Sequence, residues 1–236
     1  MRPGRRRLLV GCAWLMMIGS ASARTLEVGP RRELKNPSDA ARIAQDGDRI
    51  AIDPGEYLDC ALWRANDLTI EASDPANAVG VVLTDRACAG KASFVVIGND
   101  VTLRGLTFTR IRVPDGNGAG IRAEGRNLTV ERGIFVNNQM AILAADQPTG
   151  FLVIRDSEFA ANGACDAGRC VGALGIGRLA RLRVERSRLR DPRGSQGEAG
   201  AQIASAAQTT EIIDNRIEDG AGASSFLVAY TADAPW

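Results

Sequence analysis

The chain has 236 residues, with 29 Lys and Arg side chains against 28 Asp and Glu and a formal net charge of +1 at pH 7. It contains no histidine, which excludes serine or cysteine triads with an imidazole base and zinc sites with histidine ligands. The basic excess typical of nucleic-acid-binding proteins is absent, so we expect no nucleic acid as a partner.

The first 23 residues have the pattern of a bacterial secretory signal peptide. Four arginines precede or open an apolar run over 8–18, and small residues end at Ala23. This predicts cleavage between Ala23 and Arg24 and a secreted or periplasmic protein. Cleavage removes four of the 29 basic side chains and no acid, which leaves 25 against 28 and a net charge of −3.

Two other export signals remain open in the same segment. The residues from Leu9 to Cys12 form a lipoprotein-like box, although the apolar run continues beyond Cys12, and the arginine pair before Leu8 leaves a twin-arginine route open. No later apolar run approaches the roughly 20 residues that cross a bilayer, so we predict no membrane span.

After the leader, the sequence predicts a cap and then a first strand. The stretch 36–47 opens with Asn36 and Pro37, which suit the start of a short helix that ends by Gly47. The stretch 48–53 lies between two turn signals and alternates apolar and polar residues, which predicts the first rung of a sheet. A helix here would cover backbone groups at the open end of a stack of strands.

A short repeat then recurs six times. Each copy alternates two apolar positions with polar ones, such as Leu128 and Val130 in "NLTVE", and five copies carry Phe, Leu or Ile five residues further on. The copies begin 24 to 33 residues apart, at Leu68, Val101, Leu128, Leu152, Leu182 and Thr210. A repeat of this length without a long helical pattern predicts an all-β solenoid with coils about 4.8 Å apart.

The residue after the second aliphatic is charged in five copies and alternates in sign. These residues are Glu71, Arg104, Glu131, Arg155 and Glu185. Opposite charges on neighbouring coils would pair, so we favour a ladder of salt bridges over a charged binding stripe.

Four cysteines remain after the predicted cleavage, an even number in an oxidising compartment. Cys60 and Cys88 are 28 residues apart, about one coil, which would place them on adjacent rungs within disulfide reach. Cys165 and Cys170 can close a small ring in a glycine-rich loop. We predict these two disulfides, because a metal site would need histidine or paired Cys-x-x-Cys spacing.

The segment "AQDGDRIAIDPGEY", followed by repeats of the type "NLTVERGIF", resembles the secreted right-handed parallel β-helix proteins of the pectate-lyase-like superfamily. The resemblance extends from about Leu26 to Tyr230. It implies a right-handed parallel β-helix of about six to seven coils, a single domain over 24–236 with a cap helix in 36–47. It is weak for activity, because this fold hosts lyases, hydrolases, epimerases and adhesins.

The resemblance also implies a groove along the strand that follows each "NLTV" unit. Alternation predicts inward Ile121, Ile142, Leu174 and Ile203, and outward Arg122, Glu124, Leu143, Ala173, Gly175, Gln202, Ala204, Leu227 and Ala229. Among these outward residues only Arg122 and Glu124 are charged, and Gln202 is the one sizeable polar group of the next four strands. Related enzymes carry histidines in the later strands, so the resemblance implies a groove that has lost them.

Loops beside the groove add polar groups. Asp115 and Asn117 flank one edge, and Arg178 opens an arginine-rich run that would suit an anionic polymer, although we favour a solvated face. Asp115 and Asn117 with nearby carbonyls would suit Ca²⁺, but Asp-Gly-Asn-Gly is also an ordinary turn, which we favour. We expect no other cofactor.

The sequence therefore favours an exported β-helix protein without catalysis that binds a polysaccharide or another envelope component. The alternative is a polysaccharide lyase or related carbohydrate enzyme with Arg122 as base or carboxylate clamp beside Glu124. A second alternative is a structural or adhesin-like module. The candidate binding residues are Asp115, Asn117, Arg122, Glu124, Arg178 and Gln202.

The C-terminal end of the stack carries a separate expectation. The last recognisable coil begins near Thr210, and only 231–236 follow its groove strand. We expect the aromatic tail, or self-association with a second chain, to cover the apolar end of the solenoid.

Overall fold

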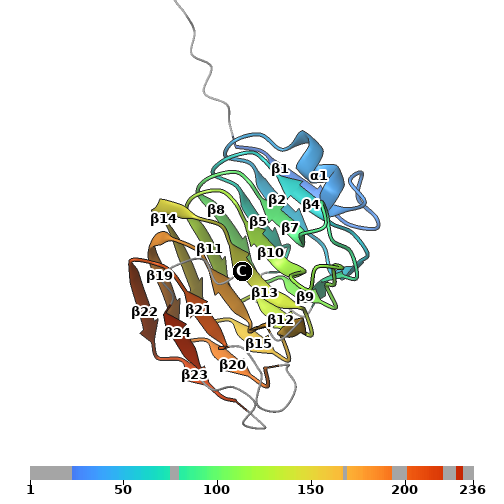
Figure 1. Ribbon diagram of the computed structural model, residues 1–236. Helices are drawn as coiled ribbons and strands as arrows, with labels where there is room; N and C mark the ends of the chain where they lie inside the picture. The colour runs from blue at the N-terminus through green and yellow to red at the C-terminus, as the bar shows by residue number, and fades with distance from the viewer. Residues whose placement is uncertain (1–22, 75–79, 167–168, 193–200, 220–226, 231–236) are drawn as a thin grey trace, which may run out of the picture.

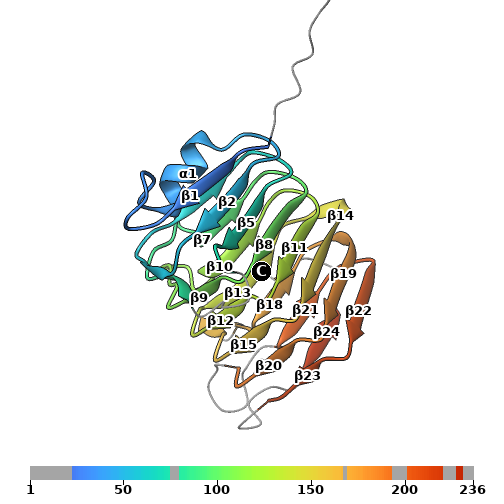
Figure 2. The same cartoon turned by 180° about the vertical axis from the view of Figure 1, so that it is seen from behind.

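The computed structural model of the chain describes residues 23–74, 80–166, 169–192, 201–219 and 227–230. Within them the chain winds into about seven coils, with three parallel sheets running along the stack (Figures 1 and 2). The predicted all-β parallel solenoid is confirmed.

The three sheets are named A, B and C below. Sheet A consists of β1 (Thr25–Val28), β2 (Arg49–Ile52), β5 (Thr69–Ala72), β8 (Val101–Arg104), β11 (Leu128–Glu131), β14 (Gln147–Arg155), β19 (Leu179–Glu185) and β22 (Thr209–Ile213). Sheet B consists of β3 (Gly55–Tyr57), β6 (Val81–Thr84), β9 (Thr107–Thr109), β12 (Ile134–Val136), β15 (Glu158–Ala160), β20 (Arg188–Arg190) and β23 (Arg216–Ile217). Sheet C consists of β4 (Ala61–Trp63), β7 (Ala92–Val96), β10 (Ala119–Ala123), β13 (Met140–Ala144), β18 (Leu174–Ile176), β21 (Ile203–Ser205) and β24 (Val228–Tyr230).

The predicted cap helix is present as α1 (Pro37–Ile43), at the N-terminal end of the stack (Figure 1). Asn36 is its N-cap, and the Asp39 carboxylate accepts the backbone N–H of Asn36 at 3.0 Å. The prediction that 48–53 forms the first rung is wrong, because β1 precedes it and pairs in parallel with β2. Val28 of β1 is fully buried, so the apolar core already begins there.

The repeat copies lie in register, and their apolar side chains form the core. Leu128 lies between Val101 and Leu152 in neighbouring coils. In sheet B the rings of Phe108, Phe135 and Phe159 stack with centroids 5.2 and 5.0 Å apart. This stack of like residues is what the repeat predicted.

The predicted salt-bridge ladder is also present on sheet A. Its first members pair in sequence: Arg49 with Glu71 at 2.5 Å, Glu71 with Arg104 at 3.7 Å, Arg104 with Glu131 at 2.8 Å, and Glu131 with Arg155 at 2.5 Å. Burial raises the pKa of Glu131, but hydrogen bonds from its two arginines outweigh burial and hold that pKa below its ordinary value. The charges of this surface are therefore largely satisfied by one another.

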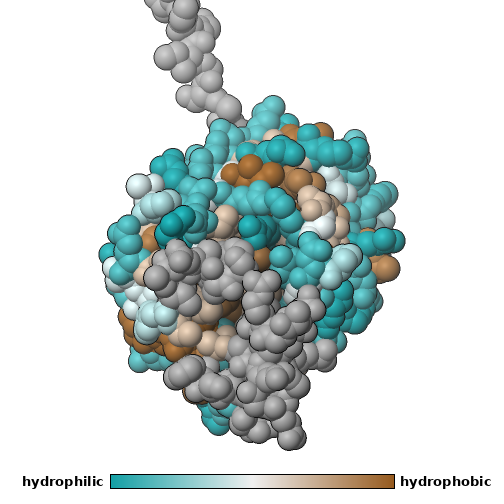
Figure 3. Space-filling view, viewed as in Figure 1, coloured by the Kyte–Doolittle hydropathy of each residue, from teal (hydrophilic) through white to brown (hydrophobic). Residues whose placement is uncertain are grey.

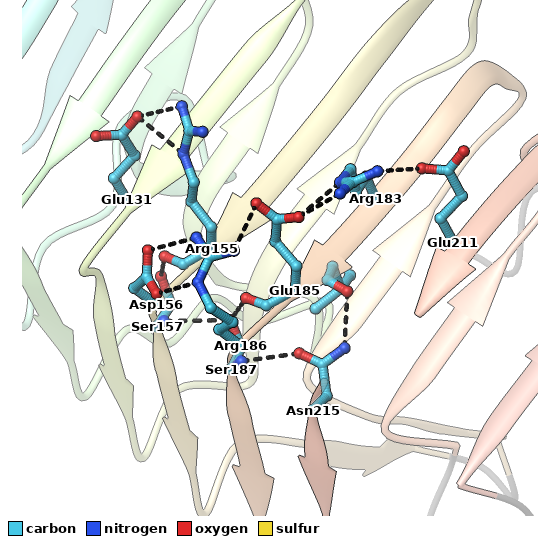
Figure 4. Close-up of polar contacts among 11 residues, drawn as sticks. Glu131, Arg155, Asp156, Ser157, Arg183, Glu185, Arg186, Ser187, Glu211 and Asn215 are labelled. Atoms are coloured by element: carbon cyan, nitrogen blue, oxygen red, sulfur yellow. Dashed lines mark hydrogen bonds and ion pairs between the residues drawn. The ribbon is translucent and has the colours of Figure 1, made fainter. Parts of the chain in front are cut away.

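Glu185 departs from the predicted ladder. It lies beside Arg155 in register, yet its carboxylate pairs with Arg183 at 2.6 Å and Arg186 at 3.1 Å (Figure 4). Both arginines belong to the same coil as Glu185, and they pair with its carboxylate in place of Arg155 on the neighbouring coil.

One of the two predicted disulfides is confirmed. Cys60 and Cys88 are bonded, with their Cα atoms 5.4 Å apart. Cys165 and Cys170 face each other in the antiparallel pair β16 (Ala164–Asp166) and β17 (Arg169–Val171), but their side chains lie outside the described part, so that bridge stays a prediction. The leader 1–22 and the tail 231–236 also lie outside it. Among the described residues, no helix is long and apolar enough to cross a membrane.

Candidate functional site

Three of the predicted site residues meet in a hollow of about 240 Å³ beside sheet C. The hollow is lined by Ala89, Gly90, Lys91, Asp115, Asn117, Arg122 and Leu143. Its floor comes from β10 and β13, and its walls from the loops that lead into β7 and β10. We call this feature the Arg122 hollow.

Arg122 is a cation between two aliphatic neighbours. On the outward side of sheet C it lies in register with Val95 and Leu143, which are 1% and 2% exposed. Its own side chain is 18% exposed, and its buried Nε has no hydrogen-bond partner. Burial lowers the pKa of Arg122, and the charge of Glu124 opposes that shift. A guanidinium nevertheless stays protonated at neutral pH, so the hollow holds a partly desolvated positive charge.

Glu124 is shared between two cations at the edge of the hollow. Lys91 donates to its Oε1 at 2.5 Å, whereas Arg122 Nε lies 3.7 Å from the same oxygen. The distance to Arg122 is too long for a hydrogen bond, so this ion pair leaves the Nε–H of Arg122 unsatisfied.

Lys91 reaches this position through a tight turn held by the disulfide. Its backbone N–H donates to the Cys88 carbonyl at 2.9 Å, and Ala89 and Gly90 between them both have positive φ. Cys88 is tied to Cys60, which precedes β4 on the previous coil. Sequence reasoning missed Lys91, because it did not identify the strand 92–96 as part of the groove.

The Asp-Gly-Asn-Gly segment forms a braced turn. Gln139 Oε1 accepts the backbone N–H groups of Val113 and Gly118 at 2.7 and 2.8 Å, and the Gln139 amide donates back to the Val113 carbonyl. Asp115 and Asn117 are thus presented at the rim by a fixed loop. Among the described residues, no group of three or more His, Cys, Asp or Glu side chains is placed to hold a metal ion.

Two candidate residues lie apart from the hollow. Arg178 follows β18 and pairs with Asp146 at 2.5 Å. Gln202, expected on the outward face, is 1% exposed, and its amide donates to the Glu218 carbonyl at 3.1 Å. The expectation of an open position for Gln202 is therefore wrong, because a later segment of the chain covers it.

The outward expectation for Ala173 is wrong as well, because Ala173 belongs to the main core. Leu143 lies on the outward side as expected, where it is buried in a second apolar cluster with Ala92, Val95, Ala119 and Met140. Seen from the side of Figure 1, apolar surface lies in patches among polar side chains (Figure 3).

A second hollow of about 520 Å³ lies toward the cap helix. It is lined by Ser38, Ala41, Arg42, Cys60, Leu62, Arg64 and Cys88. Leu62 is in register with Val95, which is in register with Arg122, so the two hollows occupy neighbouring coils of the same sheet. Each hollow has arginine in its lining, Arg122 in the first and Arg42 and Arg64 in the second.

The comparisons with known proteins give structural likeness without sequence likeness. No protein-family model and no curated protein matches the sequence. A solved pectin methylesterase in complex with a hexasaccharide matches with a TM-score of 0.60 and 12% identity, over 86% of this chain and 70% of that chain. Pectin methylesterase PemA from Erwinia chrysanthemi matches with a TM-score of 0.53 and 12% identity, over 82% and 67%. A pectate lyase matches with a TM-score of 0.36 and 13% identity, over 79% and 69%. The chain thus shares the right-handed parallel β-helix fold that its repeats resemble.

Proposed function

We propose that the protein is a carbohydrate-active enzyme that binds an acidic polysaccharide in the Arg122 hollow and cleaves it by β-elimination. The observation that carries the proposal is the buried Nε of Arg122, which lacks a partner between Val95 and Leu143. A planar carboxylate of a uronate sugar supplies the bidentate acceptor that a guanidinium prefers. A buried cation with a free donor has a stronger need for such a ligand than a solvated one.

The roles follow from the charges in the hollow. Arg122 neutralises the uronate carboxylate, which makes the proton on the adjacent ring carbon more acidic. Because its guanidinium stays protonated, Arg122 acts as the clamp and not as the base. The Asp115 carboxylate at the rim takes the proton, whereas Glu124 is held by Lys91. The released electron pair forms a carbon–carbon double bond, the glycosidic carbon–oxygen bond breaks, and water protonates the leaving oxygen.

Hydrolysis of a sugar ester is the second candidate. Two solved structures with TM-scores above 0.5 are pectin methylesterases, and one holds a hexasaccharide. Asp115 and Asn117 in the same hollow would serve as a carboxylate and an amide donor for that chemistry. An ester is neutral, however, and leaves the charge of Arg122 without a counterpart, so we place elimination first.

Binding of the polysaccharide without catalysis is a third possibility, which the experiment below separates from both reactions. The row beyond Arg122 continues as Leu143, Gly175, Ala204 and Ala229, and these residues bring no acid or base. Among the described residues of this row, a polymer would find a charged side chain at Arg122 alone.

The test is to incubate the purified chain from Arg24 onward with polygalacturonate, alginate, hyaluronan and methyl-esterified pectin. Elimination predicts unsaturated sugar ends that absorb ultraviolet light, and loss of this signal in Asp115→Asn and Arg122→Met. Arg110→Met, which removes an exposed arginine paired with Asp85 outside the hollow, is the matched control and should keep the activity. Methanol release without unsaturated ends would replace elimination with ester hydrolysis. Binding to an acidic polymer without either product would refute catalysis.

A further inference from the structure

The backbone nitrogen of Arg24 lies against a buried carboxylate. It donates to Asp48 Oδ1 at 3.1 Å, and the guanidinium of the same residue reaches Asp48 Oδ2 at 2.6 Å. Asp48 is 2% exposed, although it precedes β2 in a turn at the N-terminal end of the stack. A buried carboxylate is stable only where donors surround it, so this position is built to receive positive charge.

The neighbouring backbone fixes Arg24 from both sides. Its carbonyl accepts the N–H of Arg49 at 2.8 Å, which begins the pairing of β1 with β2. Its guanidinium also donates to the carbonyl of Ile43 at the end of α1, at 3.0 Å. Gln45 N–H donates to Asp48 Oδ2 at 2.9 Å, which holds the carboxylate in place. Ala23, directly before this arrangement, is exposed.

We propose that Asp48 is the receptor for the α-ammonium group that leader cleavage creates at Arg24. The inference rests on the predicted cut between Ala23 and Arg24 and does not depend on the proposed enzymatic function. In the precursor, the nitrogen beside Asp48 is an amide with one proton. Hydrolysis adds water across the peptide bond, so that Ala23 leaves with a carboxylate and Arg24 keeps an ammonium with three protons.

The new ammonium faces a carboxylate that already accepts hydrogen bonds at both oxygens. The guanidinium reaches Oδ2 at 2.6 Å and, through Nε, Oδ1 at 3.3 Å, and the backbone nitrogen shares Oδ1 at 3.1 Å. Two charged residues beside Asp48 in the sequence are engaged elsewhere, since Arg49 pairs with Glu71 and Asp46 accepts from Asn66. Cleavage therefore replaces a bond in which only the acceptor is charged by one in which donor and acceptor carry opposite charges, which adds a Coulomb attraction between them.

The folded chain should therefore become more stable when the leader is cleaved. In the precursor, or in a chain with one extra residue, the charged N-terminus lies away from Asp48, and the nitrogen of Arg24 just before β1 is an uncharged amide. In the processed chain, the first strand of sheet A is tied to the turn before β2 by two cations of one residue. The chain that begins at Arg24 should then resist both thermal unfolding and acylation of its α-amine better than a chain that begins one residue earlier.

The experiment compares chains that begin at Arg24 and at Ala23, each with Asp48 and with Asp48→Asn. We expect the added alanine to lower the melting temperature by about 2–4 °C in the Asp48 pair, the shift typical of one such interaction in a chain of this size. The difference should vanish in the Asp48→Asn pair, and equal melting temperatures in the Asp48 pair would overturn the proposal.

A second readout does not require the Asp48 variant to fold. At neutral pH, acylation of the α-amine should be about tenfold slower in the chain that begins at Arg24 than in the chain that begins at Ala23, as expected for a pKa raised by one unit. Equal rates would overturn the proposal. An exported protein whose first residue is not Arg24 would overturn it as well.

Discussion

Arg122→Met should stabilise the fold while it removes ligand binding. The substitution exchanges a partly desolvated cation for an apolar side chain of similar length between Val95 and Leu143. A buried donor without a partner costs about 1–3 kcal/mol. Because the Arg122 side chain is still 18% exposed, we take the lower end of this range and expect a gain in unfolding free energy of about 1 kcal/mol. For a chain of this length that corresponds to a rise in melting temperature of about 2–4 °C.

The assay pairs urea denaturation with calorimetric titration of a uronate oligomer. Arg110→Met is the control, since Arg110 is solvent-exposed and pairs with Asp85 at 2.8 Å and Glu56 at 3.1 Å. The control should bind like the unchanged protein and should not become more stable. If Arg122→Met proves less stable than the unchanged protein, the unpartnered Nε does not destabilise the fold. If it still binds the oligomer with full affinity, the hollow does not recognise the carboxylate.

Four further predictions concern the frame that carries the hollow. Phe135→Ala removes the middle ring of the stack between Phe108 and Phe159 and should cost about 3–5 kcal/mol in urea denaturation, whereas a loss below 1 kcal/mol would contradict close packing there. Replacing Cys60 and Cys88 by serine removes a bridge between residues 28 apart and should lower the free energy of unfolding by about 3 kcal/mol. It should also weaken oligomer binding, because the turn that presents Lys91 is no longer tied to the previous coil. Unchanged affinity would show that the turn keeps its position without the disulfide. The hydrogen bond from Arg24 lowers the pKa of Asp48 to about 2, below the unfolded value near 3.9, so its stabilisation is complete above that value and is lost as pH falls through about 2. The difference in unfolding free energy from Asp48→Asn should therefore shrink between about pH 4 and 2, and a constant difference would disprove the linkage. Peptide mapping without reduction should find Cys165 linked to Cys170, and a link from either to Cys88 would exclude the predicted pairing.

The coils could be predicted because their pattern is local and repeated. Alternation with period two fixes which side chain of each strand points inward, and the spacing of the copies places Leu128 between Val101 and Leu152. The cap helix was readable from Asn36 and Pro37 for the same reason, since capping depends on neighbours in sequence.

What the sequence did not show depends on contacts between distant segments. The strand β7 is a run of five buried residues without alternation, so its membership of sheet C, and with it the role of Lys91, was missed. Gln202 has the alternation of an outward residue, but the Glu218 carbonyl covers its amide. Glu185 follows the charge pattern of its repeat, yet two arginines of its own coil outcompete the neighbouring one.

We propose above that the Arg122 hollow recognises the negative charge of a sugar acid. The direct measurement is calorimetric titration with two oligomers of equal length, one of galacturonate and one of its methyl ester, into the unchanged protein and Arg122→Met. We expect the unchanged protein to bind the acid more tightly than the ester by at least tenfold, about 1.4 kcal/mol, and Arg122→Met to lose this preference. Equal affinity for both oligomers, or a preference that survives in Arg122→Met, would contradict it.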